Sequence, residues 1–418
     1  MTFTAIFLAF LVVGLLARFY LSQKHMKFIL AHRNEVPSGF SQQVSLEDHQ
    51  KAADYTIAKI KIGSLETIFS AAVLIVFTLI GGLQYLHQTL LQFIAAGVWQ
   101  QVALILSLSF ITGLLDLPFS WYRQFNLEAT FGFNRMTAKL FWLDYIKGTL
   151  LGLVIGVPLL WVVLTLMAQA GEYWWVLAWA VLVAFVFFAT WIGPTYIAPL
   201  FNKFQPLEEG PLKEKIQDLL TRCDFISQGL FVMDGSKRSA HGNAYFTGIG
   251  KAKRIVFFDT LIEKLSPAEI EAVLAHELGH FKKKHIRKRL ITTFIMSLLG
   301  LALLGWVSTQ AWFYFDLGVT PELDGNNGGL ALALFTLALP VFTFFLTPIS
   351  SFFSRKHEFE ADAFAAEKTN ANDLVTALVK LYQDNAATLT PDPTYSAFYD
   401  SHPPAPIRIA NLKKLASA

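Results

Sequence analysis

The sequence predicts an all-α membrane protein with a small β element. Hydrophobic residues make up 54% of the 418 residues, and the mean hydropathy is +0.45. Charged residues account for only 16%, whereas soluble domains contain about 25%. The net charge of +3 is too small to indicate a nucleic-acid partner. The one cysteine, Cys223, excludes an intrachain disulfide and zinc sites built from cysteines.

Seven apolar segments are each long enough to cross about 30 Å of hydrocarbon. Pro158, Pro340 and Pro348 lie inside them and are expected to kink helices, which membrane bundles tolerate. The first segment lacks a basic start and a small-residue cleavage site, so we expect a span rather than a signal peptide. The predicted spans are 3–22, 64–86, 99–121, 147–168, 174–198, 290–315 and 329–353.

The distribution of lysine and arginine predicts the orientation. These residues are frequent in three loops and absent from the three that alternate with them. Because positive loops stay in the cytoplasm, the N-terminus is expected outside and the C-terminus in the cytoplasm. The basic stretch Lys282–Arg289 is expected to contact anionic lipid rather than nucleic acid. The positive loops are 23–63, 122–146 and 199–289, and the others are 87–98, 169–173 and 316–328.

An HExxH motif, His276-Glu277-Leu278-Gly279-His280, indicates a zinc-hydrolase centre. On a helix, positions i and i+4 share a face, so both imidazoles can reach one Zn²⁺. Glu277 is then placed to accept a proton from the attacking water. Ser266 to Glu269 resemble a capping box with Pro at the first helical position. The helix is expected over about 267–290, running into the sixth span without a break.

The third metal ligand is expected shortly after residue 353, at the same depth as the two histidines. If 354–368 is helical, Glu358 and Asp362 share a face, and Glu360 points about 200° away from Glu358. Spacing favours Glu358 as the ligand, with Asp362 orienting a ligand imidazole. His357 is the main competitor as ligand, and an ordinary charged helix next to the membrane is the alternative for the whole cluster.

These elements divide the chain into four predicted parts. Three short runs in the second part are predicted to form a sheet or hairpin beside the site, namely Leu230–Met233, Ala244–Ile249 and Arg254–Phe258. The stretch from Pro391 to Pro406 is expected to be a loop. The parts are transmembrane helices with loops (1–198), a cytoplasmic peptidase insertion (199–289), two further spans (290–353) and a cytoplasmic C-terminal segment (354–418).

The chain resembles the type I CAAX prenyl protease family, which are integral-membrane zinc metallopeptidases. The similarity covers nearly the whole chain and is most specific in the stretch from Ser354 to Asp362, which matches the pattern SRxxEFxAD. Further matches are Gly132-Phe133-Asn134, Pro199 to Phe204, Asp234 to Arg238, His241 to Phe246, Phe258 to Leu261, Tyr395 to Ala397 and Ser401 to Pro404.

The resemblance implies seven tilted helices ringed around a water-filled intramembrane chamber, with the zinc centre on its cytoplasmic side. It implies that Glu358 is the third ligand and that Asp362 contacts a ligand without binding the metal itself. It also places Asn243 and Ala244 on a strand that pairs with substrate, and assigns transition-state stabilisation to His402. Without the resemblance, Asn243 would be interpreted as a turn residue, and His402 would be interpreted as a histidine in an exposed loop. Arg408 is expected either to tie the C-terminal helix to the site or to be solvated.

The expected function is therefore that of a membrane-embedded zinc metalloendopeptidase with one Zn²⁺ per chain. Its substrates are expected to be peptides or proteins, either prenylated CAAX-type C-termini or, in bacteria, membrane proteins under quality control. Membrane lipid is the other expected partner. A bacterial inner membrane is the expected location, or the endoplasmic reticulum in a eukaryote. The alternative is a transporter or lipid-handling protein with a structural zinc site. An intramembrane site-2 protease is disfavoured, because the motif lies in lysine-rich sequence rather than inside a span.

Overall fold

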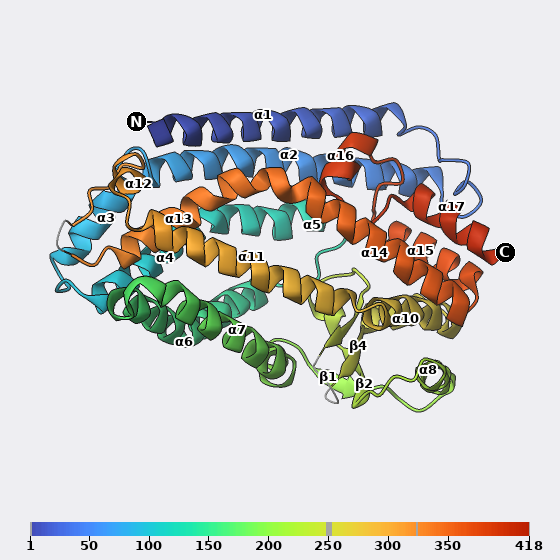
Figure 1. Ribbon diagram of the computed structural model, residues 1–418. Coiled ribbons are helices and arrows are strands. Elements are labelled where there is room, and N and C mark those ends of the chain that lie inside the picture. Colours follow the sequence, from blue (N-terminus) through green and yellow to red (C-terminus); the bar gives the residue numbers. More distant parts are fainter. Residues whose placement is uncertain (1, 248–252, 323–324, 418) are drawn as a thin grey trace.

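Long apolar helices form most of the molecule. The computed structural model describes residues 2–247, 253–322 and 325–417 (Figure 1). Within these residues, seven helical stretches are long and apolar enough to cross a membrane, which confirms the predicted number. They are α1 (Thr2–Ala31), α2 (Leu46–Phe77), α4 (Val98–Tyr122), α6 (Ala138–Gln169), α7 (Trp174–Ile192), α11 (His285–Val307), and α13 (Gly328–Thr343) with α14 (Thr347–Lys368).

These helices bury little of their surface against each other. In six of the seven stretches, no more than 22% of the most apolar window is buried. A helix that crosses a membrane does not need to bury its apolar side chains in protein, because lipid tails solvate them. The water-filled chamber itself stays a prediction.

Two predicted spans end earlier than expected. The second, predicted at 64–86, is a helix that begins at Leu46, where the Ser45 hydroxyl caps it, and ends at Phe77. Gly81 follows with a φ of 86°, a left-handed conformation that turns the chain. The sixth, predicted at 290–315, ends at Val307. Separate short helices follow each of them, α3 (Gly82–Leu91) and α12 (Ala311–Phe315).

The seventh span is interrupted in its middle. A 3₁₀ turn at Phe344–Leu346 separates α13 from α14. Pro348 has no N–H to donate to the carbonyl of residue 344, which interrupts the regular hydrogen bonding there. The helix then continues to Lys368, which confirms the expectation that 354–368 is helical.

The HExxH motif lies on α10 (Pro267–Lys282). The predicted capping box is confirmed, because the Ser266 side chain accepts from the Glu269 N–H and the Glu269 side chain accepts from the Ser266 N–H. The prediction of an unbroken helix into the sixth span is wrong. Lys284 adopts a left-handed conformation with φ 61° and ψ 28°, and α11 begins at His285. Such a conformation costs about 1–3 kcal/mol, so tertiary contacts must hold the bend.

A small sheet lies beside α10. In the described residues its strands run in the order β1-β2-β4-β3, with β2 parallel to β4 and the other pairs antiparallel. The three predicted runs are confirmed as strands, although residues 248–249 of the second lie outside the described residues. The strands are β1 (Phe204–Pro206), which was not predicted, β2 (Gly229–Met233), β3 (Ala244–Thr247) and β4 (Arg254–Phe258).

The sheet and α10 share a hydrophobic core with the C-terminal helices. Buried side chains of β4 and α10, such as Phe257 and Ile270, pack in one cluster with Leu378 and Leu412. The expected loop from Pro391 to Pro406 is wrong in part, because it contains α16. Asp392 accepts from the Tyr395 N–H and Pro393 follows it, which together favour a helix start. The surrounding helices are α8 (Pro211–Arg222), α15 (Ala371–Asp384), α16 (Pro393–Tyr399) and α17 (Ala405–Ala416).

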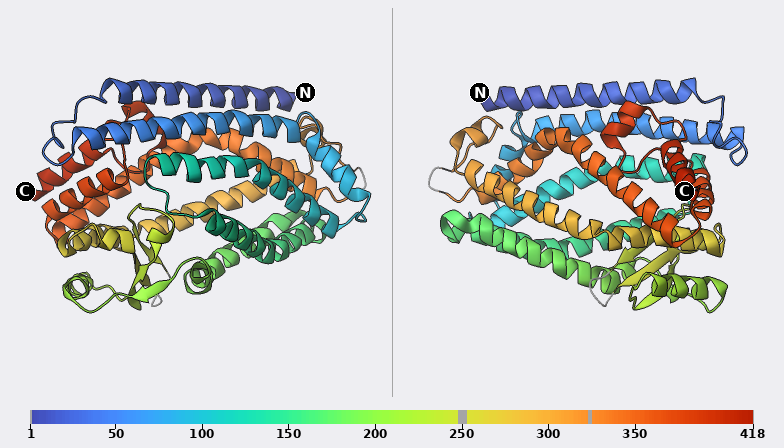
Figure 2. Two further views of the ribbon diagram at one scale, coloured as in Figure 1. Left: turned by 180° about the vertical axis from the view of Figure 1, so that it is seen from behind. Right: turned by 45° about the vertical axis from the view of Figure 1, so that its right-hand side comes forward.

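The sheet, α8, α10 and α17 gather at one end of the helix bundle. The C-terminus lies at this end, whereas the N-terminus lies at the far end of α1 (Figures 1 and 2). The HExxH helix therefore lies at the end of the bundle where α11 begins and where α14 continues into the C-terminal region.

Glu269 gives a test of how α10 is anchored. Its carboxylate accepts from the Ser266 N–H at 2.7 Å and from Lys380 Nζ at 2.8 Å. We expect Glu269→Ala to lower the free energy of unfolding by about 1–3 kcal/mol, through loss of the cap and of a buried hydrogen-bond partner. The exposed Glu263, changed in the same way, should cost less than about 0.5 kcal/mol. Thermal unfolding in detergent measures both.

The contribution of Glu269 also has a predicted pH dependence. Burial raises its pKa, but the hydrogen bonds from Lys380 and Ser266 outweigh burial and hold the pKa below its ordinary value. The stabilisation is therefore complete above the unfolded-state pKa, about 4.3, and is lost as the pH falls through the lower folded-state pKa. The stability difference between the wild type and Glu269→Gln should shrink in acid. A difference that stays constant from pH 7 to pH 3 would contradict this assignment.

Candidate metal centre

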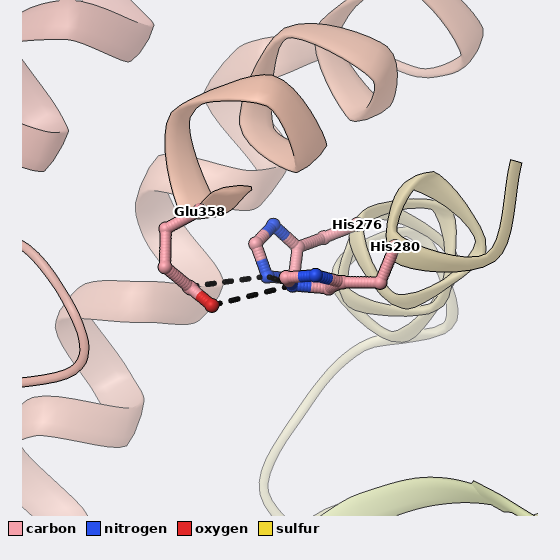
Figure 3. Close-up of side chains that lie close together, drawn as sticks. All are labelled: His276, His280 and Glu358. Carbon is pink, nitrogen blue, oxygen red and sulfur yellow. Dashed lines mark hydrogen bonds and ion pairs between the residues drawn. The ribbon is translucent and has the colours of Figure 1, made fainter. Parts of the chain in front are cut away.

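Three side chains from two helices converge where α10 packs against α14. His276 and His280 project from α10, and Glu358 projects from α14 (Figure 3). The Nε2 atoms of the two histidines are 3.2 Å apart, and His280 Nε2 lies 3.3 Å from Glu358 Oε1. His276 Nε2 lies 3.5 Å from Glu358 Oε2. Ligands about 2.0–2.1 Å from a tetrahedral zinc ion are about 3.3 Å apart, so these distances fit one such ion.

Close packing of α10 on α14 makes this convergence possible. A Cβ atom added at Gly279 would lie 2.9 Å from Ala361 Cα and 3.2 Å from the Phe364 side chain. Only a residue without a side chain allows the two backbones to approach so closely. Gly279 therefore brings the face of α14 that carries Glu358 against the face of α10 that carries the histidines.

The site is suited to a cation. Within the described residues, Glu358 Oε2 is a buried oxygen without a hydrogen-bond partner. Burial and the charge of Arg408 lower the pKa of His276, but the neighbouring carboxylates of Asp362 and Glu358 outweigh them and raise this pKa above its ordinary value. Surroundings that favour a proton on this imidazole also favour a metal ion there. Three protein donors leave a fourth position open, as in catalytic zinc sites.

Asp362 and Arg408 lie behind His276. Asp362 Oδ1 is 2.8 Å from His276 Nδ1, which leaves Nε2 of that ring free to face Glu358. Arg408 donates to both oxygens of Asp362, at 2.8 and 2.7 Å, and is 5% exposed. Glu358 and Asp362 are 4% and 0% exposed. These values contradict a solvated charged helix, and they show that Arg408 ties α17 to the site.

His280 has a different environment, which was not predicted. Its Nδ1 lies 3.1 Å from Nδ1 of His285, and His285 Nε2 lies 2.9 Å from Glu360 Oε2. His357, the competing candidate ligand, stacks on His285 with ring centroids 4.0 Å apart and lies outside the group of His276, His280 and Glu358. The sequence did not predict this contact, because residues five apart, such as His280 and His285, lie on different faces of a continuous helix.

Glu277 and His402 are the residues predicted to act on substrate. Glu277 is partly buried on α10 between the two histidines in sequence. His402 comes from the loop before α17, and its Nε2 lies 3.5 Å from Glu358 Oε1. It lines a pocket of about 610 Å³ together with residues of α1 and α2, such as Arg18 and Lys59. The structure thus brings His402 to the site, although its side chain is 63% exposed.

Asn243 and Ala244 lie at the start of the edge strand. The carbonyl of Asn243 accepts from the Phe258 N–H at 2.9 Å, and Ala244 pairs with Phe257 of β4. The Asn243 side chain accepts from the Ala244 N–H at 2.8 Å. The ladder of β3 to β4 uses one edge of β3, and β3 is the last strand on that side of the sheet among the described residues. The roles predicted for both residues stay predictions.

Comparison with known proteins identifies the family. Residues 206–416 match "Peptidase family M48", and residues 25–203 match "CAAX prenyl protease N-terminal, five membrane helices". The chain belongs to peptidase family M48. It is therefore a multi-pass membrane protein and a zinc metalloprotease, which acts on peptide or protein substrates. The resemblance and the fold class predicted from the sequence are confirmed, and the transporter alternative is not favoured.

Relatives share nearly the full length of the chain. CAAX prenyl protease 1 of Saccharomyces cerevisiae is 34% identical over 404 residues, covering 90% of this chain and 88% of the relative. The CAAX prenyl protease 1 homolog of Arabidopsis thaliana is 40% identical over 307 residues, covering 71% of each chain. The crystal structure of S. mikatae Ste24p aligns with a TM-score of 0.91 at 33% identity, covering 98% of both chains.

Proposed function

We propose that this protein is a zinc endopeptidase that removes C-terminal peptides from prenylated, CAAX-type substrates at the cytoplasmic face of its membrane. His276, His280 and Glu358 would hold one Zn²⁺. The observation that carries the proposal is the meeting of these three donors, 3.2–3.5 Å apart, around a buried carboxylate oxygen that has no hydrogen-bond partner among the residues the structure describes. Two relatives, 34% and 40% identical, are CAAX prenyl protease 1 and a homolog of it, and they support the substrate class.

The residues around the site have distinct tasks. A zinc ion, when bound, polarises the scissile carbonyl and activates the attacking water. Glu277 accepts the proton of that water and passes it to the leaving amine. His402 Nε2, which lies 3.5 Å from Glu358 Oε1, donates to the oxygen that gains charge in the transition state. Asp362 fixes the tautomer of His276, and Arg408 holds Asp362 in place.

The edge strand β3 would bind the substrate. An extended peptide can pair with the free edge of a strand and so add to the sheet, with main-chain hydrogen bonds fixing its direction. Asn243 and Ala244 begin this strand, and β3 contacts α10, which carries the HExxH motif. Pairing from Ala244 onward would align one peptide bond with Glu277.

The arrangement of the chain ends supports the predicted orientation. The site and the C-terminus lie at one end of the bundle, and the N-terminus lies at the far end of α1 (Figure 2). A cytoplasmic site then requires an external N-terminus. The basic residues that begin α11, such as Arg287 and Lys288, would lie at the cytoplasmic surface against anionic lipid.

A cleavage assay tests the proposed substrate class. The purified full-length protein is incubated with a farnesylated CAAX peptide and with the same peptide lacking the lipid, and product masses are measured. We expect removal of the last three residues from the farnesylated peptide at a rate at least about 10-fold higher, a difference of about 1.4 kcal/mol in transition-state binding. Equal cleavage of both peptides, or cleavage at unrelated bonds, would contradict CAAX processing and would favour a role in membrane-protein quality control.

A further inference from the structure

The two candidate histidine ligands are oriented in different ways. His276 Nδ1 faces the carboxylate of Asp362 directly, at 2.8 Å. His280 Nδ1 instead faces Nδ1 of another imidazole, His285, at 3.1 Å. That second ring reaches a carboxylate through its other nitrogen, with His285 Nε2 2.9 Å from Glu360 Oε2.

One set of protonation states satisfies every group in this chain. If His280 binds a metal through Nε2, its Nδ1 carries the proton and donates to His285 Nδ1. A neutral His285 that accepts at Nδ1 carries its proton on Nε2, and that N–H donates to Glu360. Each nitrogen then has one role, and the carboxylate charge is transmitted to His280 through one intervening imidazole.

We propose that His285 and Glu360 are positioning residues that orient His280 and raise its affinity for the metal. The inference rests on the metal centre proposed above. Partners behind a metal ligand set its ring orientation and basicity, and their loss typically weakens metal binding about 10–100-fold. His285 is 4% exposed, so water cannot readily replace it as the partner of His280.

The bend at Lys284 allows the rings of His280 and His285 to meet. In an unbroken helix, residues five apart lie about 140° from each other around the axis, and their rings could not meet. The left-handed conformation of Lys284 ends α10 and turns the first residue of α11 back towards His280. His357 stacks on one face of His285 but makes neither of the two hydrogen bonds of that ring. The free-energy cost of the left-handed conformation at Lys284 is therefore offset by the contact that it allows between His285 and His280.

Five variants of the full-length protein in detergent test the proposal: three at His285, together with His357→Ala and Glu360→Ala. His285→Asn places an amide oxygen where the wild-type ring has Nδ1, so it can still accept from His280, whereas His285→Gln reaches only the position of Nε2. His285→Ala removes both positions, and His357→Ala removes the stacked ring but neither hydrogen bond. Zinc affinity is measured by competition with a chromophoric chelator. Thermal unfolding of the metal-free protein shows whether each variant is folded.

We expect the zinc dissociation constant to rise about 10-fold or more in His285→Ala and His285→Gln. It should change less than about 3-fold in His285→Asn and His357→Ala, and Glu360→Ala should weaken binding at least about 3-fold. Unchanged affinity in His285→Ala, or an equal loss in His285→Asn and His285→Gln, would overturn the proposal. An equal loss in His357→Ala would also overturn it, since stacking would then account for the effect.

His280→Ala separates this inference from the proposed function. If His280→Ala binds zinc as tightly as the wild type, the proposed metal centre is wrong. If His280→Ala loses zinc while His285→Ala keeps the wild-type affinity, the metal centre stands and only the role of His285 and Glu360 fails.

Discussion

Glu277→Gln is expected to lower peptide cleavage by about 100- to 10,000-fold while the protein keeps its zinc. The amide has nearly the same size as the carboxylate but cannot accept a proton at neutral pH. General acid–base catalysis typically contributes about this factor to a rate. Glu277 lies between His276 and His280 in sequence but is not one of the three clustered donors, so its change should leave metal binding intact. Cleavage rate and zinc content of the purified variant measure the two effects separately.

Glu271 provides a matched control for this experiment. It lies on the same helix, α10, and pairs with Lys215 and Arg222 of α8, away from the metal donors. Glu271→Gln should leave the cleavage rate within about 3-fold of the wild type, because it changes no group at the site. A Glu277→Gln protein that keeps wild-type cleavage would show that another group accepts the proton.

Glu358→Ala is expected to remove most of the bound zinc and, with it, the activity. The change deletes one of three protein donors and also leaves Arg408 with one fewer acidic neighbour, since Arg408 NH1 lies 3.5 Å from Glu358 Oε2. The zinc content of the purified protein, measured by metal analysis, should fall from about one per chain to well below that ratio. Addition of a chelator to the wild type should abolish cleavage in the same way, and zinc should restore it.

Two variants on the same helix control for this result. Glu367 lies near the end of α14, pairs with Lys368 and is far along the helix from Glu358, so Glu367→Ala should keep its zinc. His357→Ala should also keep most of its zinc, because this ring stacks on His285 and does not face the other ligands. Normal zinc content in Glu358→Ala, together with its loss in His357→Ala, would move the third ligand to His357.

Local patterns in the sequence predicted much of this architecture. Apolar runs of sufficient length identified the seven spans, because a lipid environment requires about 20 consecutive apolar residues. The capping box at Ser266 identified the start of α10, and short runs of β-branched and aromatic residues identified β2, β3 and β4. The overlooked start of α16 also had a local signal, Asp392 followed by Pro393, which loop-like composition obscured.

Other features left no local signal. Lys284 is an ordinary residue in a lysine-rich run, and nothing around it predicts a left-handed conformation. The bend brings His285 into contact with His280 and Glu360, and these contacts are between residues that no local pattern brings together. Arg408 could equally have been solvated, and only the fold shows that it reaches Asp362 from a helix 46 residues further along the chain.

The amino-acid sequence alone indicated a zinc hydrolase and a membrane protein with seven spans. Both conclusions rest on local patterns, the HExxH motif and the seven apolar runs, which involve only residues close together in the chain. The meeting of Glu358 with His276 and His280 depended on packing between helices separated by two membrane crossings. Gly279 permits that packing through a close approach to Ala361 that no spacing rule encodes. Distances between ligands from different helices are set by side chains that fill the space between them, and these contacts exist only after the chain has folded.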